Sequence, residues 1–377
     1  MNRNFAFDCI GYGLFAILIL IAVPWALDFD GFELNTFARY LALGMVAMAL
    51  ALSWGYAGIL NLGQAATFGL GAYIMAMHLK LKASVNNPDG MPDFMGWTNV
   101  ESLPWFWAPF DSVAVTILAG LLVPVFVAAV MGIFMFRGRI TGVFVAIITL
   151  AFLVAIQLVF IEEQRYTGGF NGITGLAPLE LFGWTADGYS LDFYYFVAAC
   201  LIAALALCIA LVRSKVGLVL RAIKEDPSRV RFFGYDVARY ETLAFCMSAA
   251  IAGWAGMLYV LVLEFAAPTY MGVPFSLAIV IWCAVGGRES LVAAALGGII
   301  VNMLEGRLSD LFVDGWTLFL GAAFILVVLL MPKGLFGLFQ SAMDRIVSFY
   351  GKATAERRES LQGGRPIGSE STEKGGR

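Results

Sequence analysis

Long apolar runs separated by short polar loops dominate this chain. A helix needs about 20 mostly apolar residues to cross the hydrocarbon core of a bilayer. Ten candidate runs lie at residues 10–27, 36–53, 63–80, 112–136, 140–162, 192–212, 241–264, 273–286, 290–307 and 316–331. The pattern predicts an all-α fold, a polytopic membrane helix bundle of about ten transmembrane or re-entrant helices. Three of these runs, 63–80, 273–286 and 290–307, are short or rich in glycine, so we expect broken or re-entrant helices there.

Composition supports the same class of protein. Hydrophobic residues make up 60% of the 377 and charged residues 14%, whereas soluble domains carry about 25% charged residues. The first apolar run lacks a small-residue cleavage site, so it is interpreted as a retained span. Residues 1–340 are predicted to form one membrane domain. Residues 341–377 form a polar tail that we expect to be cytoplasmic and largely disordered from residue 351.

The distribution of Lys and Arg predicts the orientation of the bundle. Cations gather in the connections at 137–140, 213–240 and 287–289 and in the tail, and acidic residues prevail in the connections between them. Cytoplasmic loops of membrane proteins are enriched in Lys and Arg. Both termini are therefore predicted to lie in the cytoplasm. The aromatic residues of the acidic loop at 81–111 are interpreted as interfacial anchors; they are Trp97, Trp105, Phe106 and Trp107.

The residue types needed for catalysis do not come together in the sequence. It shows no nucleotide-binding loop, no cluster of metal-ligand spacing and no pair of nucleophile and base. The single histidine, His78, is interpreted as an interfacial residue near a helix end, and the five cysteines lack ligand spacing. We expect no catalytic residue, no metal and no cofactor in this chain.

Polar groups inside the apolar runs are candidates for a solute path, because each costs free energy in hydrocarbon and tends to face a bundle interior. Three pairs recur at helical spacing: Asn61 with Gln64, Thr149 with Gln157, and Asn302 with Glu305. Two interpretations stay open. The pairs could line a route for a small polar solute, or they could form hydrogen bonds between helices without touching solute.

A glycine-rich loop at 165–176 is predicted to lie on the outer side. Its glycines permit tight turns and close approach of the backbone. A structured outer gate is one interpretation and a plain flexible loop is the other. The residues of the gate would be Gly168, Gly169, Asn171, Gly172, Thr174 and Gly175.

The loop at 213–240 is short, basic and well patterned. It is predicted to contain a short helix, an interruption at Pro227 and a turn at Gly234. A folded element of this kind at a cytoplasmic surface suggests a docking site for a soluble partner.

Several segments resemble the permease subunits of branched-chain amino acid and urea ABC importers. They are WGYAGILNLGQAATFGLGAYIMA (54–76), GRITGVFVAIITLAF (138–152), TGGFNGITG (167–175), residues 217–258 and MPKGLFGLF (331–339). The segments MPDFMGW and LPWFWAPF are more similar to the urea branch. The resemblance implies a multi-pass protein of the bacterial inner membrane that moves a small polar solute, most simply urea, by alternating access.

The resemblance also implies partners. They are a second, related permease, two cytoplasmic ATPase subunits that carry ATP and Mg²⁺, a periplasmic solute-binding protein and the surrounding membrane lipid; nucleic acid is not expected. The residues implied to couple the chain to an ATPase are Arg221, Ala222, Ile223, Glu225, Asp226, Arg229 and Gly234.

Alternatives to urea import remain at this stage. The solute could be a branched-chain amino acid or a short amide. A zwitterion would favour a paired anion and cation near the path, and the sequence shows Glu305 and Arg307 but no clear mid-membrane pair. An ATP-independent channel, a secondary transporter or a membrane scaffold are rival classes. The docking loop and the scarcity of intramembrane carboxylates argue against the first two.

Overall fold

The computed structural model describes residues 11–311 except 88, 89, 99 and 182, together with the single positions 321, 334 and 337. The described part is a helix bundle. Its long helices are α3 (Gly31–Ala51), α4 (Gln64–Ala83), α6 (Val113–Arg137), α7 (Val143–Glu162), α9 (Leu191–Arg213), α12 (Val237–Leu263), α13 (Val273–Gly286) and α14 (Leu291–Leu311). An apolar helix at Gly11–Ala26, which includes η1 (Leu18–Ala22) and α2 (Val23–Ala26), precedes them.

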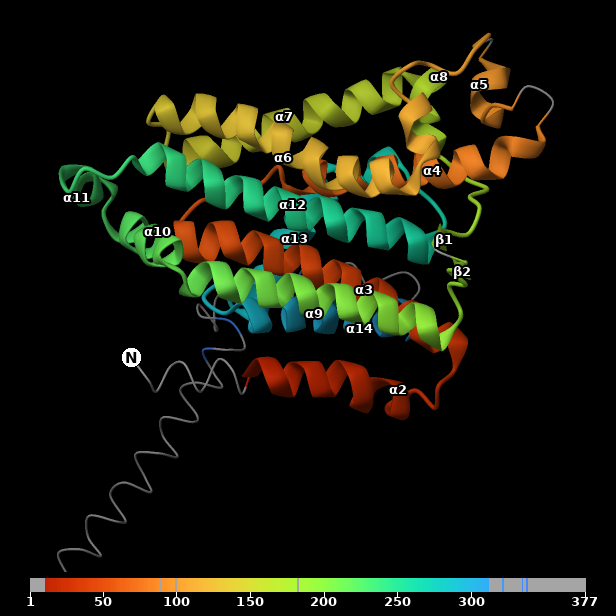
Figure 1. Cartoon of the computed structure of the whole chain (residues 1–377). Coiled ribbons are helices and arrows are strands. Elements are labelled where there is room, and N and C mark those ends of the chain that lie inside the picture. The colour runs from red at the N-terminus through yellow and green to blue at the C-terminus, as the bar shows by residue number, and fades with distance from the viewer. Residues whose placement is uncertain are drawn as a thin grey trace, which may run out of the picture.

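Helix α12 lies in the middle of the bundle and packs against α4, α6 and α3 (Figure 1). Helices α9, α13 and α14 surround α3 on the other side. The N-terminal helix lies at the edge against α9, where the Tyr194 hydroxyl donates to the Ile19 carbonyl at 2.7 Å. The main core is therefore built around α3, α4 and α12.

Glycines let these central helices approach very closely. A Cβ on Gly71 of α4 would overlap the Gly253 carbonyl of α12, and a Cβ on Gly256 would overlap the Phe68 carbonyl of α4. Small residues at such crossings allow backbone-to-backbone packing in membrane bundles. Ser248, Ala252 and Gly256 recur every four residues along the side of α12 that makes this contact, and all three are buried.

The predicted spans agree with the helices that the structure describes. Nine of the ten runs coincide with helices, and the tenth, 316–331, lies outside the described residues. By length and composition six helices of the described part can cross a membrane: Gly31–Tyr56, Val113–Arg137, Val143–Glu162, Leu191–Arg213, Val237–Leu263 and Leu291–Leu308. The all-α membrane fold is confirmed, whereas the predicted tail at 341–377 lies outside the described residues.

The structure locates the helix break beside the glycine-rich runs, and the re-entrant alternative stays a prediction. Helices α4, α13 and α14 are continuous, and the break lies before α4 rather than inside it. The π-helical turn η2 (Leu52–Tyr56) extends α3, and residues 58–63 then leave the helical conformation. Glycine alone does not break a helix that is packed on all sides, because close packing stabilises it.

Short elements gather at the two ends of the bundle (Figure 1). Helices α10 (Lys215–Glu225) and α11 (Pro227–Phe232) lie at one end. At the other end lie α5 (Asp93–Trp97), α8 (Gln164–Thr167) and the two-stranded β1 (Glu180–Leu181) and β2 (Trp184–Thr185). The basic and the acidic loops thus lie at opposite ends, as the charge pattern requires. Short η turns complete the connections: η3 (Ser84–Asn86), η4 (Ala108–Asp111), η5 (Gly169–Asn171) and η6 (Pro268–Met271).

Two residues interpreted as interfacial are instead interior. His78 is buried on α4, and its Nδ1 lies 2.6 Å from the Phe110 carbonyl. Because a carbonyl oxygen only accepts, Nδ1 is the donor in this hydrogen bond. Trp107 is also buried, and its indole nitrogen donates to the Tyr166 carbonyl at 3.0 Å. Trp97 and Trp105 remain exposed, as expected of anchors.

Candidate functional site: the helix break and the coupling helices

The break before α4 joins the two candidate sites found in the sequence. Residues 58–63 follow η2 without helical structure, and Gly58 has a φ of +75°, a left-handed conformation that favours glycine. A Cβ there would lie 3.3 Å from Cγ of Lys224 on α10. The break therefore lies directly against the coupling helix at one side, and it leads into Asn61 and Gln64 at the other.

Asn61 and Gln64 form the centre of a buried polar network. The Asn61 amide donates to Gln64 Oε1 at 2.7 Å, and Gly63 N donates to Asn61 Oδ1 at 2.9 Å. Gln64 Nε2 donates to the Ser248 carbonyl of α12 at 3.2 Å. The Ser248 hydroxyl in turn donates to the Ala49 carbonyl of α3 at 2.6 Å. The network ties α3, the break, α4 and α12 together.

Two further helices hold the same break. Leu62 N donates to the Thr149 hydroxyl of α7 at 3.1 Å, and the Ser276 hydroxyl of α13 donates to the Leu62 carbonyl. Unpaired backbone groups are costly in a buried position. Side chains of neighbouring helices thus satisfy the groups that the missing helical turn leaves free.

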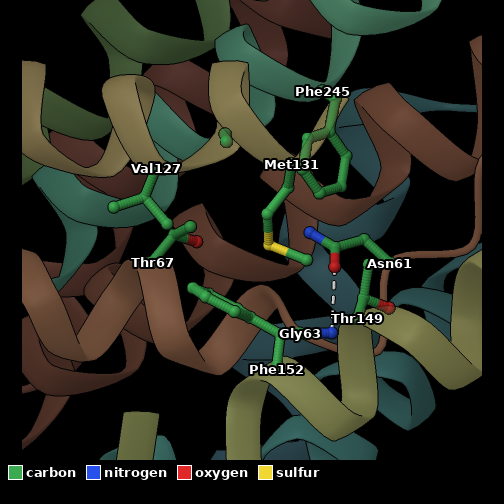
Figure 2. Close-up of a pocket in the computed structure, with 9 residues that line it drawn as sticks. Asn61, Gly63, Thr67, Val127, Met131, Thr149, Phe152 and Phe245 are labelled. Atoms are coloured by element: carbon green, nitrogen blue, oxygen red, sulfur yellow. Dashed lines mark hydrogen bonds between the residues drawn. The ribbon is translucent and has the colours of Figure 1, made fainter. Parts of the chain in front are cut away.

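A small hollow of about 10 Å³ adjoins this network (Figure 2). Three polar residues face it: Asn61, Thr67 and Thr149. The rest of its wall is mostly apolar and comes from Gly63, Val127, Ala128, Met131, Phe152 and Phe245. The hollow combines a few polar groups with an apolar wall and has room for about one water molecule in this conformation.

Helix α10, the predicted coupling helix, packs on the helical turn just before the break. Lys224 Nζ donates to the Gly55 carbonyl at 2.8 Å. The guanidinium of Arg221 lies 5.3 Å from the centre of the Tyr56 ring, which is within the range of a cation–π contact. Movement of α10 would therefore be passed to residues 55–56 and on to the break.

The local structure of the coupling loop follows the sequence prediction. Ser214 caps α10 and Asp226 caps α11, where its carboxylate also pairs with Arg229 at 2.9 Å. Pro227 begins α11, and Gly234 has a φ of +86° with open space around it. The short helix, the interruption and the turn are all confirmed.

The predicted coupling residues divide by exposure. Ile223 is 1% exposed and packs with Val230 and Val237, so it supports the loop from inside. Arg221, Ala222 and Glu225 are exposed. Sequence reasoning missed Phe232 and Phe233, which are 89% and 77% exposed. The signal for them was an aromatic pair in an otherwise polar, basic loop.

The glycine-rich loop at the opposite end is folded and anchored. Ile173 and Ala266 exchange both backbone hydrogen bonds, at 2.7 and 3.1 Å. Gly168 and Gly172 have φ values of +79° and +72°, and a Cβ on Gly172 would overlap the Ala266 carbonyl. Of the predicted gate residues, Gly168 and Gly169 are buried, whereas Asn171, Thr174 and Gly175 are exposed.

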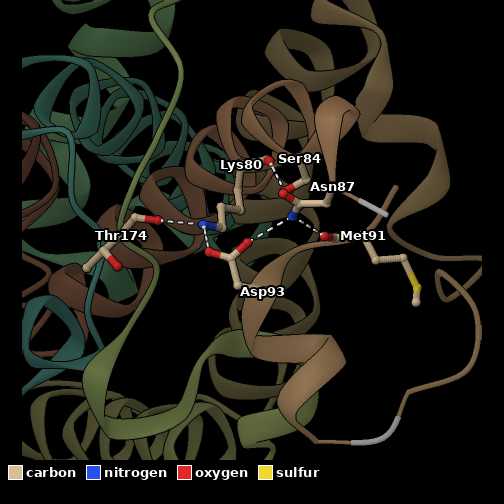
Figure 3. A network of polar contacts seen from close by, with 6 residues as sticks. All are labelled: Lys80, Ser84, Asn87, Met91, Asp93 and Thr174. Atoms are coloured by element: carbon tan, nitrogen blue, oxygen red, sulfur yellow. Dashed lines mark hydrogen bonds and ion pairs between the residues drawn. The ribbon is translucent and has the colours of Figure 1, made fainter. Parts of the chain in front are cut away.

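Lys80 links this loop to α4 and α5 (Figure 3). Its side chain is 6% exposed, and Nζ donates to Asp93 Oδ2 at 2.8 Å and to the Thr174 carbonyl at 3.0 Å. The hydrogen bond from Lys80, helped by one from Asn87, lowers the pKa of Asp93 below its usual value. The carboxylate thus stays ionised under mildly acidic conditions and holds the loop in position.

The remaining polar candidates lie away from the network around Asn61. Gln157 is half-buried beside Gly272, and Asn302 donates to the Gly298 carbonyl of its own helix at 2.7 Å. Glu305 is half-buried on α14. Among the described residues, no hydrogen bond joins these three side chains to Asn61 or Gln64.

Arg39 was missed by sequence reasoning. It is the only charged residue in the apolar run 36–53, and it lies half-buried on α3, which packs against α14. Its charge acts on Glu305 and on the Tyr259 and Tyr270 rings of the adjacent aromatic cluster. A lone cation inside an apolar run was the signal that could have found it.

Comparison with known proteins now identifies the family. Residues 33–329 match the model of the permease component of the branched-chain amino acid transport system. The chain belongs to this family. It is 27% identical over 351 residues to the high-affinity branched-chain amino acid transport system permease protein LivM of Escherichia coli K12, covering 85% of this chain and 74% of that protein.

Two further relatives place the chain more broadly. The LivM protein of Salmonella typhimurium is 27% identical over 345 residues, 84% of this chain and 73% of that protein. The ribose import permease protein RbsC of E. coli is 24% identical over 208 residues, 54% of this chain and 63% of that protein. No solved structure matches the chain. The chain is thus a transport permease component rather than an enzyme.

Proposed function

We propose that this chain is one of two related permease subunits of an ATP-driven importer, and that α10 and α11 receive the movement of a cytoplasmic ATPase. The proposal rests on the direct contact between α10 and the helical turn that precedes the break, through Lys224 with Gly55 and Arg221 with Tyr56. ATP and Mg²⁺ belong to the partner subunits. The orientation has both termini in the cytoplasm of a bacterium, with α10 and α11 at the inner face of its inner membrane.

In this proposal the break is the moving part of the transport cycle. A displacement of α10 pulls residues 55–56, and the network of Asn61, Gln64 and Ser248 passes it to α12. Bundles of packed helices switch between discrete arrangements rather than deforming continuously. Binding of ATP shifts the balance between them only through a difference in affinity for the two states.

In this proposal the outer end of the bundle receives solute from the binding protein. We assign the anchored loop with Gly168, Gly169, Asn171, Gly172, Thr174 and Gly175 to an outer gate beneath a periplasmic solute-binding protein. The outward faces of α6 and α7 are strongly apolar and exposed, which suits lipid or the second permease; they include Leu118, Leu122, Phe126, Phe144, Ile147 and Leu158.

The solute that we favour is a branched-chain amino acid. Two observations support it: the names of the two LivM relatives, and the opposite charges of Arg39 and Glu305 on two adjacent helices. A zwitterion presents a carboxylate and an ammonium group that match this pair. Urea is the second candidate, favoured by the segments MPDFMGW and LPWFWAPF.

Replacement of Arg39 by glutamine separates the two solutes. Hydrogen bonds to charged groups contribute about 1.5–3 kcal/mol, so Arg39→Gln should lower the uptake of labelled leucine about tenfold or more. Arg307→Gln is the matched control, because Arg307 is exposed on α14 and faces Glu33 at 3.7 Å. Uptake is measured per folded complex, with labelled leucine beside labelled urea.

The outcomes of that experiment are distinct. Leucine uptake that falls in Arg39→Gln and persists in Arg307→Gln supports an amino acid path. Urea uptake without leucine uptake in the unmodified complex moves the assignment to urea. The polar residues Asn61, Gln64, Thr149, Gln157, Asn302 and Glu305 remain the proposed path in either case.

A further inference from the structure

A second, larger cavity opens at the end of the bundle that carries the coupling helices. Its volume is about 150 Å³. The break contributes Ala57, Gly58 and Ile59, and the turn between α6 and α7 contributes residues 140–142. Helix α10 and the start of α11 close it from the third side. The cavity thus lies between α10, the break and the turn between α6 and α7.

Glu241 of α12 is the most unusual residue in the wall. It is 6% exposed, and among the described residues its carboxylate has no hydrogen-bond or ion-pair partner. Arg231 of α11 is close enough for its charge to act on it, without forming an ion pair. The carboxylate faces the cavity without a partner among the described residues, so a ligand that supplies a donor to it gains a charge-assisted hydrogen bond.

A cation lies in the same wall. Lys224 lines the cavity, and within the described part of the chain its ammonium donates one of its three hydrogens, to the Gly55 carbonyl at 2.8 Å. Donors therefore remain for an anionic group. The cavity offers an acceptor for an ammonium group and a donor for a carboxylate.

Most of the other side chains in the wall are apolar, and Thr141 adds a hydroxyl. Phe136, Ile140 and Val145 come from α6, the turn and α7, and Ile59 and Ile223 come from the break and α10. Most of these residues belong to or pack against one hydrophobic cluster. An apolar side chain of a few carbons would bury its surface there, at about 25 cal/mol per Å².

We propose that this cavity binds a zwitterionic α-amino acid with an apolar side chain, with its ammonium group on Glu241 and its carboxylate on Lys224. The ligand bridges α12 and α10 and holds the coupling helix in the position seen here. A ligand that binds one conformation shifts the equilibrium toward it. This inference rests on the proposed function and orientation, which place the site on the cytoplasmic side. Amino acid that accumulates in the cytoplasm therefore slows its own import.

Equilibrium binding to the reconstituted complex tests the site. Labelled leucine is the probe, without ATP and without binding protein, and Arg39→Gln is present throughout to weaken binding in the proposed path. Glu241→Gln and Lys224→Met should each weaken leucine binding about tenfold or more, since each removes a charge-assisted contact. The matched controls are Glu289→Gln and Lys215→Met, which alter exposed charges at the same end of the bundle that do not line the cavity.

Ligand analogues and a blocking variant sharpen the test. Leucinamide lacks the carboxylate and 4-methylpentanoate lacks the ammonium group, so both should bind at least about tenfold more weakly than leucine. Thr141→Trp should fill the cavity from an exposed position on the turn and abolish binding while leaving both charges in place.

Two results would overturn the inference: leucine binding that is unchanged in Glu241→Gln, Lys224→Met and Thr141→Trp, or no leucine binding in a complex whose unmodified form imports leucine. Leucine import that persists in Arg39→Gln contradicts the proposed solute path instead, whatever the cavity variants do. The two proposals therefore fail separately.

Discussion

The Gly256→Val substitution is expected to lower strongly the stability and the yield of folded permease. Gly256 lies against the Phe68 carbonyl at the crossing of α12 and α4, and a Cβ there would overlap that backbone atom and come within 3.0 Å of Ala72 N. Overpacking a tight core costs about 1–3 kcal/mol or more, and a backbone clash cannot be relieved by a side-chain rotation. We expect Gly256→Val to reach the upper end of that range, because α12 is central to the bundle.

Fluorescence-detected size-exclusion chromatography and a thermal unfolding scan measure this effect. Gly13→Val is the matched control, since Gly13 also lies on an apolar helix but has no atom near its Cβ position. The control should elute and unfold like the unmodified protein. A monodisperse Gly256→Val protein with an unchanged unfolding temperature would contradict the packing described between α12 and α4.

The second large effect concerns the exposed aromatic pair at the end of α11. Replacing Phe232 and Phe233 together by alanine is expected to leave the permease folded but to release the ATPase. The two rings lie 6.2 Å apart and are almost fully exposed, so they contribute little to the core. Aromatic residues that anchor an interface typically cost 2 kcal/mol or more when truncated, or about 30-fold in affinity.

Co-purification with the ATPase and ATP-driven uptake are the measurements for this variant. Trp97→Ala is the matched control, because Trp97 is similarly exposed at the opposite end of the bundle. ATPase retained at the unmodified level by the double variant would exclude the pair as a docking element. Loss of the ATPase in the control as well would point to a general defect in assembly.

Much of the fold could be predicted because the apolar runs are long and the residues that end or interrupt helices act locally. Pro227 and Gly234 act through their own backbone geometry, so the interruption and the turn in the coupling loop could be predicted from a few neighbouring residues. The basic and acidic loops were likewise separated correctly, because charge bias is a property of each loop by itself.

The rest depends on contacts between residues far apart in the chain. Lys224 belongs to the site because α10 folds back on Gly55, and Lys80 is buried because Thr174 and Asp93 meet it from two other elements. The interior positions of His78 and Trp107 likewise depend on packing that no local pattern encodes. Asn61 and Gln64 were found from their spacing, but their partner Ser248 follows only from the crossing of α4 and α12.

Uptake into proteoliposomes that contain the complete complex tests the central claim, that this permease is driven by partner ATPases through α10 and α11. The account predicts accumulation of solute against its gradient with hydrolysable ATP, none with a non-hydrolysable analogue, and none when Phe232 and Phe233 are replaced by alanine. Equal uptake with and without ATP, unaffected by that replacement, would contradict the account and identify a channel or a secondary transporter.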